Sequence, residues 1–371
     1  MKSDTRTTLD NAIDTQNPIL VTAANGNTGL LAAKELLLLG FKVRAMVRNK
    51  NAIGAVELTK LGAEIFVGDM NDIRDLRLAL KGVKRAYFCA PFDGNSLFKT
   101  IAFIVAAEEE KLEHVVYMTQ WLASEAHHSM VTKSHWLGDQ IVKMHQHVNY
   151  TFVNPGLFGF VYFLTAETVA QLGLMPTVVK GATTGKVGLN APPSEEDQGR
   201  VIAHILKNPT PHIGKTYRPT GPKEISLLEV ANIFEKVLGR SVKIKEISED
   251  MFLKASKSGG WPTFEYCNVR YYMKEFENNA FSFGGSVTSV VKDITGREPE
   301  DFETIARREF GRRAETSRTL SNKLSAIFHL VKMLLTPTPD MTTFEQSIDM
   351  PRFINGMKFV GSDENWKATH L

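Results

Sequence analysis

The chain has 371 residues, of which 43% are hydrophobic and 23% are charged, and its formal net charge at pH 7 is +3. This balance is ordinary for a globular protein of one large or two moderate domains, and the charge is too small to indicate a nucleic acid partner. There are two cysteines, a polar stretch over residues 1–17 and no apolar run of the about 18 residues that a membrane span needs. We therefore expect a flexible leader, no membrane span and a cytoplasmic location.

The first half of the chain alternates short apolar strands with helices. Strands are predicted over residues 18–23, 41–47, 64–67, 85–90, 114–118 and 150–153. Helices are predicted over residues 30–39, 51–61, 97–110 and 131–145, with another that begins after Asn71. This alternation predicts a Rossmann-type α/β fold, a doubly wound parallel sheet over residues 18–156 that some later segments join.

A glycine-containing turn joins the first strand to the first helix. Gly26 would let the backbone approach a pyrophosphate, and Gly29 would let the helix pack closely on the strand. The start of the helix supplies free amides and the positive end of its dipole. The residues predicted to hold the phosphates of a nicotinamide dinucleotide are Ala23, Asn25, Gly26, Asn27, Thr28 and Gly29.

The end of the second strand indicates which dinucleotide is bound. An acidic residue there would bind the ribose hydroxyls of NAD, but this strand ends in Val47-Arg48-Asn49-Lys50. Arg48 can form two charge-assisted hydrogen bonds to a 2′-phosphate, and Lys50 adds positive charge. Although Arg48 could be an ordinary surface arginine, its position favours NADP(H) as the cofactor.

These residues resemble the NmrA-like family of atypical short-chain dehydrogenases, which includes quinone, triphenylmethane-dye and azo reductases and an NADPH sensor. The resemblance begins with residues 19–49 and extends to about residue 312. It is carried further by Val67-Gly68-Asp69-Met70, Phe88-Cys89-Ala90-Pro91, and residues 150–156, 214–222, 225–231 and 296–302. The resemblance implies that Asp69 and Met70 close on the adenine and that Ala90 and Pro91 line the nicotinamide ribose. It also implies that Asn154, Pro155 and Gly156 lead from the cofactor into a substrate lobe.

Two features depart from the patterns of related dehydrogenases. Ala23 stands where the family usually has its first glycine. No tyrosine is followed four residues later by lysine, so the Tyr-x-x-x-Lys acid of ordinary short-chain dehydrogenases is absent. This absence disfavours alcohol oxidation and sugar epimerisation, which need a phenolate-type base.

The helix after the fifth strand carries the predicted catalytic residues. His135 and Asp139 are four residues apart, so they share a face and can hydrogen-bond each other. The family's reductases are similar in placing His-x-x-x-Glu or Lys-x-x-x-Glu here. Lys133 faces roughly the opposite side, so we rank His135 above Lys133 as the donor near the nicotinamide. The alternative is that His135 only packs the start of the helix.

Residues beyond the fifth and sixth strands are the candidates to contact cofactor and substrate. Thr119 is assigned to the cofactor, and Gln120, Trp121 and Phe158 to the substrate. Trp121 could stack on a planar substrate, but an aromatic residue in this position is more often part of the core. No metal site is predicted from the histidines His127, His128, His145 and His147, because no carboxylate or cysteine completes a ligand set at a usual spacing.

After residue 156 the strict alternation ends. Residues 157–315 predict a smaller mixed lobe, with helices over 165–172, 197–207 and 227–238 and short strands over 186–189, 216–218 and 242–246. Residues 316–371 predict a helical extension whose first helix has an apolar stripe from Leu320 to Leu335. Such a helix can lie on a membrane, but we favour docking on the protein itself or on a second subunit as a homodimer.

The pattern as a whole predicts an NADPH-dependent reductase of quinones, dyes or similar conjugated small molecules. Such a reaction needs a flat acceptor held against the nicotinamide and a nearby proton donor, here His135. A non-catalytic NADP(H) sensor is the alternative, and a reductase acting on an imine or double bond of one natural product is a third, weaker one.

Overall fold

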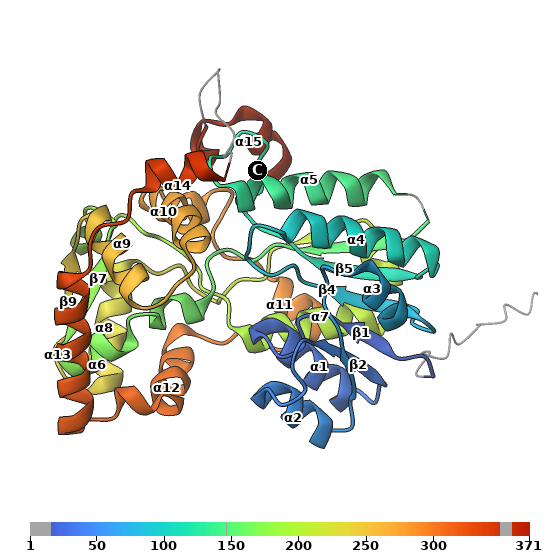
Figure 1. The fold of residues 1–371 in the computed structure, drawn as a ribbon, viewed down its shortest axis with the longest axis horizontal. Helices are drawn as coiled ribbons and strands as arrows, with labels where there is room; N and C mark the ends of the chain where they lie inside the picture. The colour runs from blue at the N-terminus through green and yellow to red at the C-terminus, as the bar shows by residue number, and fades with distance from the viewer. Residues whose placement is uncertain (1–15, 146, 349–357) are drawn as a thin grey trace, which may run out of the picture.

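A computed structural model of the protein describes residues 16–145, 147–348 and 358–371 (Figure 1). Its largest element is a parallel sheet with the strand order β3-β2-β1-β4-β5-β6-β8. The strands are β1 (Ile19–Val21), β2 (Val43–Val47), β3 (Glu64–Val67), β4 (Arg85–Phe88), β5 (His114–Met118), β6 (Asn149–Val153) and β8 (Thr216–Tyr217). The strand order reverses between β1 and β4, which is where doubly wound sheets bind ligands.

Helices cover both faces of this sheet (Figure 1). One face carries α1 (Asn27–Leu38), α2 (Ile53–Lys60), α7 (Glu195–Lys207) and α11 (Val290–Thr295). The other carries α3 (Ile73–Leu80), α4 (Ser96–Glu109) and α5 (Met130–Met144). The Rossmann-type fold is confirmed, and its elements begin and end within a few residues of the predicted positions.

Two segments that the sequence placed in the second lobe belong to the first. Strand β8 extends the parallel sheet beside β6, and helix α7 packs along α1. The two helices approach so closely that a Cβ on Gly199 would lie 2.7 Å from the carbonyl carbon of Leu31. Local sequence cannot show this packing, because it joins residues far apart in the chain.

The second lobe is built around aromatic side chains and a small parallel sheet. Strands β7 (Leu174–Thr177) and β9 (Lys243–Glu246) form this sheet. The helices are α6 (Ala166–Leu172), α8 (Leu227–Leu238), α9 (Glu249–Ser258), α10 (Thr263–Glu277) and α12 (Phe302–Arg312). The strand predicted over residues 186–189 does not form; the nearest pairing is a single bridge from Asn190 to Ile225.

The C-terminal extension folds as α13 (Leu320–Leu335), α14 (Met341–Ser347) and α15 (Glu364–His370). Helix α15 docks at the end of the first lobe through Trp366, which is 2% exposed. Helix α13 lies on the outer side of the second lobe beside α6 and α9 (Figure 1). The helix docks on the protein itself, which is one of the two expected modes, but it does so through its mostly polar side and leaves its apolar stripe exposed. The predicted leader lies almost entirely outside the described residues.

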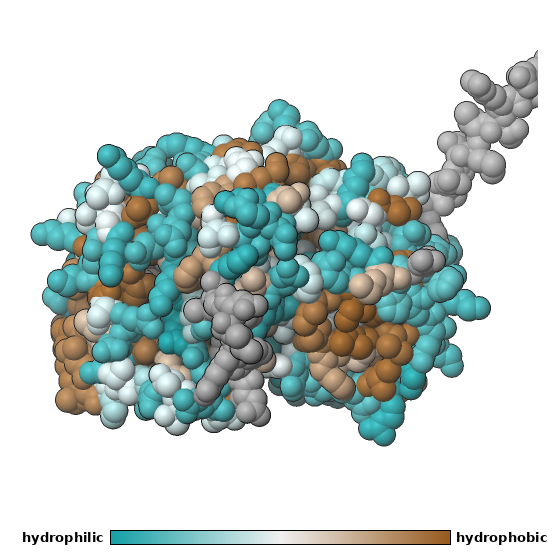
Figure 2. All heavy atoms as spheres, turned by 90° about the horizontal axis from the view of Figure 1, so that it is seen from above, coloured by the Kyte–Doolittle hydropathy of each residue, from teal (hydrophilic) through white to brown (hydrophobic). Residues whose placement is uncertain are grey.

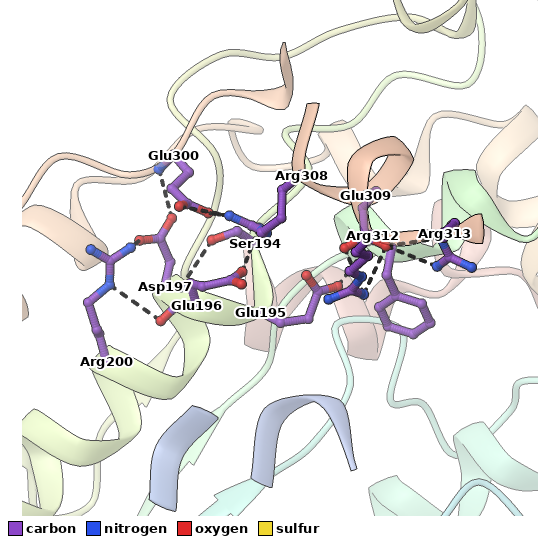
Figure 3. Close-up of polar contacts among 11 residues, drawn as sticks. Ser194, Glu195, Glu196, Asp197, Arg200, Glu300, Arg308, Glu309, Arg312 and Arg313 are labelled. Atoms are coloured by element: carbon purple, nitrogen blue, oxygen red, sulfur yellow. Dashed lines mark hydrogen bonds and ion pairs between the residues drawn. The ribbon is translucent and has the colours of Figure 1, made fainter. Parts of the chain in front are cut away.

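Partly buried ion pairs and hydrogen bonds connect the two lobes at the start of α7 (Figure 3). Arg308 of α12 pairs with Glu196 of α7 at 2.5 Å and with Glu300 at 2.9 Å. The backbone amide of Glu300 donates to Asp197 at 2.8 Å. Glu195 is 4% exposed and accepts a 3.1 Å hydrogen bond from the amide of Phe160. Glu195 and Asp197 are the buried carboxylates of this junction, and these hydrogen bonds offset part of the cost of burying them.

We expect Glu195→Gln to stabilise the protein at alkaline pH. Burial raises the pKa of Glu195 to about 7. The unfolded chain therefore loses this proton first, and stability from this group falls as the pH rises from about 4 towards 7. A glutamine side chain can still accept the hydrogen bond from the Phe160 amide, but it carries no charge. The variant should gain about 1–3 kcal/mol at pH 8 and little at pH 4, measured by urea unfolding.

Glu303→Gln is the matched control. Hydrogen bonds from Lys236 and Arg307 lower the pKa of Glu303, so its ionised form is favoured in the folded state. This variant should lose a little stability at pH 8. An equal effect of Glu195→Gln at both pH values would contradict the assignment.

Candidate cofactor and substrate site

The turn between β1 and α1 forms a tight loop that requires glycine at one position. Ala23 adopts the left-handed backbone conformation, with φ of +47°, and its carbonyl accepts from the Gly26 amide at 2.8 Å. A Cβ on Gly29 would lie only 2.4 Å from that carbonyl oxygen. The position where the family usually has glycine therefore keeps its glycine-like conformation, at some cost in strain for alanine.

Hydrogen bonds from neighbouring strands hold this turn in place. The hydroxyls of Thr28 and Tyr87 are 2.9 Å apart, and Thr22 accepts from the Cys89 amide at 3.0 Å. The N-cap of α1 is Gly26, which has no side chain to bind the first amides of the helix. No side-chain cap therefore occupies those amides, which is the arrangement that an anion at a helix start requires.

The end of β2 presents an exposed cation beside this turn. Arg48 and Lys50 are exposed, and Arg48 has no hydrogen-bond or ion-pair partner among the described residues. At the end of β3, Asp69 accepts from the amide of Asn71 at 2.9 Å, and Met70 is buried. The predicted adenine and 2′-phosphate contacts therefore lie at successive strand ends on the same edge of the sheet.

A cavity of about 740 Å³ lies between α5, the ends of β5, β6 and β8, and helix α15. It brings together five residues predicted for the site: Thr119, Gln120, Trp121, Asp139 and Asn154. Asn154 is 3% exposed, and its side-chain oxygen has no hydrogen-bond partner in the described structure. The predicted residues His135, Lys133, Phe158, Ala90, Pro91, Pro155 and Gly156 are not among those that line this cavity.

Asp139 is the titratable group of the cavity that is best placed for proton transfer. Thr119 donates to its Oδ2 at 2.6 Å. Burial raises the pKa of Asp139 to about 7, against the opposing effects of the Thr119 hydrogen bond and the charge of Lys143. A carboxyl with this pKa holds its proton for about half of the time at neutral pH.

His135 does not form the predicted hydrogen bond with Asp139. In the described structure its half-buried ring has no hydrogen-bond partner, because Asp139 turns to Thr119 instead. Burial lowers the pKa of His135 to about 4, so the ring is neutral at pH 7. Burial also lowers the pKa of Lys133. Helical spacing correctly places His135 and Asp139 on neighbouring positions but does not show which groups they meet.

Trp121 is a structural residue rather than an open stacking surface. It is 6% exposed, and its indole nitrogen donates to the carbonyl of Ala280 at 2.9 Å. The Arg218 guanidinium covers the ring at 3.7 Å from its centroid, and Trp366 packs edge-on. The predicted stacking of a planar substrate on Trp121 would have to displace Arg218. Phe158 packs beside Phe160 and the core under the sheet.

Tyr272 is a neighbour of the site that the sequence did not indicate. It lies on α10 of the second lobe, accepts from the Thr132 hydroxyl at 2.9 Å and donates to Gln120. Burial raises the pKa of Tyr272, so it acts as a neutral hydroxyl. No lysine follows at the usual spacing, and only the fold brings this tyrosine to the end of β5. The sequence also did not indicate that helix α15 forms a wall of the cavity. The only hint was a tryptophan, Trp366, within a polar segment.

Comparison with known proteins agrees with this geometry. The sequence model of the NmrA-like family matches residues 15–305. The chain belongs to the NmrA-like family. Helices α13, α14 and α15 lie beyond the region that defines the family.

Proteins with similar sequences include oxidoreductases. The uncharacterized oxidoreductase YesF of Bacillus subtilis is 26% identical over 301 residues, which cover 78% of this chain and 94% of that protein. The NAD(P)H azoreductase of Xenophilus azovorans is 27% identical over 295 residues, which cover 78% of this chain and 96% of that protein.

Solved structures of the same fold include an enzyme and a regulator. The NADPH-dependent quinone oxidoreductase from Escherichia coli, complexed with NADPH, aligns with a TM-score of 0.66 at 20% identity, over 79% of this chain and 99% of that one. NmrA, a negative transcriptional regulator in complex with NADP, aligns with a TM-score of 0.64 at 17% identity, over 79% and 95%. At these identities the likeness shows the fold.

We expect Arg48→Ala to weaken NADPH binding by about 10–100-fold and to leave NADH binding nearly unchanged. The loss corresponds to about two charge-assisted hydrogen bonds to a 2′-phosphate. Titration calorimetry with both nucleotides measures it. Lys42→Ala, an exposed cation just before the same strand, is the control. Equal losses for both nucleotides would contradict the assignment of Arg48 to the phosphate.

Proposed function

We propose that this NmrA-like protein is an NADPH-dependent reductase of quinones, dyes or similar conjugated small molecules. The observation that carries the proposal is the pairing of Asp139 with Thr119 in a cavity at the ends of β5 and β6, in a sheet whose first strand leads into a glycine turn suited to a phosphate. Its relatives named as NAD(P)H azoreductase and quinone oxidoreductase support the same reaction class.

Different residues along one edge of the sheet contact different parts of the cofactor. The amides at the start of α1 hold the pyrophosphate, and Gly29 leaves the space that this approach needs. Arg48 binds the 2′-phosphate, Asp69 and Met70 close on the adenine, and Ala90 and Pro91 line the ribose. Asn154, with its unpaired buried oxygen, faces the cavity. NADPH bound in this way supplies a hydride.

Asp139 supplies the proton that accompanies this hydride. Thr119 occupies one carboxyl oxygen, which leaves the other to carry the proton towards an acceptor in the cavity. Water then reprotonates Asp139 between turnovers. His135 lies outside the cavity lining and stays neutral, so the role predicted for it from the helix pattern becomes secondary to that of Asp139.

A non-catalytic NADP(H) sensor is the second candidate. It is favoured by one observation: Arg218 occupies the ring face of Trp121 on which a planar acceptor could have stacked. A sensor needs the phosphate turn and Arg48, but it needs neither a proton donor nor an open stacking surface.

Consumption of NADPH with a panel of quinones, triphenylmethane dyes and azo dyes tests the proposal. We expect kcat to fall as the pH rises through about 7, because Asp139 then loses its proton. Asp139→Asn should lower kcat by about 100-fold and abolish this pH dependence.

His135→Ala is the comparison variant. We expect its kcat to stay within about threefold of that of the unmodified protein, which is a small change in the activation free energy. A pH profile that persists in Asp139→Asn would remove Asp139 from the mechanism. Tight NADPH binding without turnover of any acceptor would favour the sensor instead.

A further inference from the structure

Helix α13 turns its apolar side away from the protein. Seven of its side chains are between 41% and 78% exposed. They are Leu320, Leu324, Ile327, Phe328, Val331, Leu334 and Leu335, called here the α13 stripe. Figure 2 shows hydrophobic residues gathered at its left end, the end at which Figure 1 places α13. Monomeric proteins rarely expose a contiguous apolar surface of this kind unless something binds it.

The opposite, mostly polar side attaches α13 to the second lobe. Ser325 donates to Glu167 at 3.0 Å, and His329 lies 2.7 Å from the other oxygen of the same carboxylate. Asn322 donates to the carbonyls of Ala314 and Ser317. Ala326 is the only residue of this helix that is buried. The outward direction of the stripe therefore follows from specific hydrogen bonds on the other face.

The stripe is continuous and has a lysine at each border. At about 100° per residue, its seven positions fall within about 120° of one another and lie opposite Ala326. Lys323 lies at one border of the stripe and Lys332 near the other. The Lys332 ammonium donates to the carbonyl of Ser258 at 2.9 Å, and no carboxylate of the described residues forms an ion pair with it.

The charge of the helix distinguishes between possible partners. Leu320–Leu335 contains two lysines and a histidine but no aspartate or glutamate. Exposed Lys257 ends the neighbouring helix α9, and exposed Arg318 precedes α13. A second copy would bring the same lysines against this border, where like charges repel. Anionic headgroups would neutralise them while the bilayer receives the stripe.

We propose that α13 docks the protein on the surface of an anionic phospholipid membrane. The stripe enters the boundary between headgroups and acyl chains, and Lys323 and Lys332 remain among the phosphates. The helix lies in the plane of the membrane: no helix of the described residues is long and apolar enough to cross a bilayer. This proposal is independent of the reductase function.

Co-sedimentation of the full chain with lipid vesicles tests it. We expect binding to vesicles of phosphatidylcholine with about 30% phosphatidylglycerol, weaker binding to phosphatidylcholine alone, and a further decrease when salt is raised. Leu324→Gln combined with Phe328→Gln should reduce binding at least tenfold, because it removes two of the larger side chains of the stripe. Both residues are exposed, so the fold should be preserved.

The matched control replaces two exposed apolar residues of the first lobe. Leu38→Gln combined with Ile53→Gln changes side chains that are 81% and 89% exposed, and binding should be unchanged. Equal loss in both double variants, or no binding to the anionic vesicles, would overturn the proposal. So would sedimentation velocity showing a dimer that the α13 variant dissociates, because the stripe would then be occupied by a second copy.

Discussion

Arg308 crosses the boundary between the lobes to reach two carboxylates, Glu196 on α7 and Glu300 just before α12. The three side chains are between 21% and 27% exposed, and their pairing favours packing of the two lobes at this junction. The same junction fixes the path of the chain after β6. The amide of Phe160 binds Glu195, and the amide of Gly159 donates to the carbonyl of Pro193 at 2.9 Å.

The first lobe could be predicted from the sequence because each of its strands and helices has a local pattern of its own. Alternating apolar runs mark the strands, and the glycine turn marks the start of α1. The helix expected after Asn71 is α3, which Asp72 caps through its side chain. The second lobe was harder to predict, because strand β7 contains Pro176 and pairs with β9 far along the chain. Strand β8 is only two residues long, and its sheet cannot be assigned from its own sequence.

In the candidate site too, contacts within one helix could be predicted from the sequence, whereas contacts between elements could not. Helical spacing identified His135 and Asp139 as neighbours, but the partner of Asp139 is Thr119, at the end of a different element. The sequence allowed Trp121 to stack on a substrate, but the Arg218 guanidinium covers its ring in the fold. Tyr272 reaches Gln120 from the other lobe. Contacts of this kind follow from tertiary packing, which no single-sequence pattern contains.

Helix α15 adds a third tryptophan to the cavity, which bears on the intrinsic fluorescence of the protein. The chain has four tryptophans, and three of them, Trp121, Trp136 and Trp366, line this one space. Two of these indoles are almost fully buried, and their rings meet edge-on at 5.3 Å. Three of the four tryptophans therefore lie where a molecule that enters the cavity would change their surroundings. The fluorescence of the unlabelled protein is a built-in reporter of what enters there, since emission depends on the polarity and contacts around each ring.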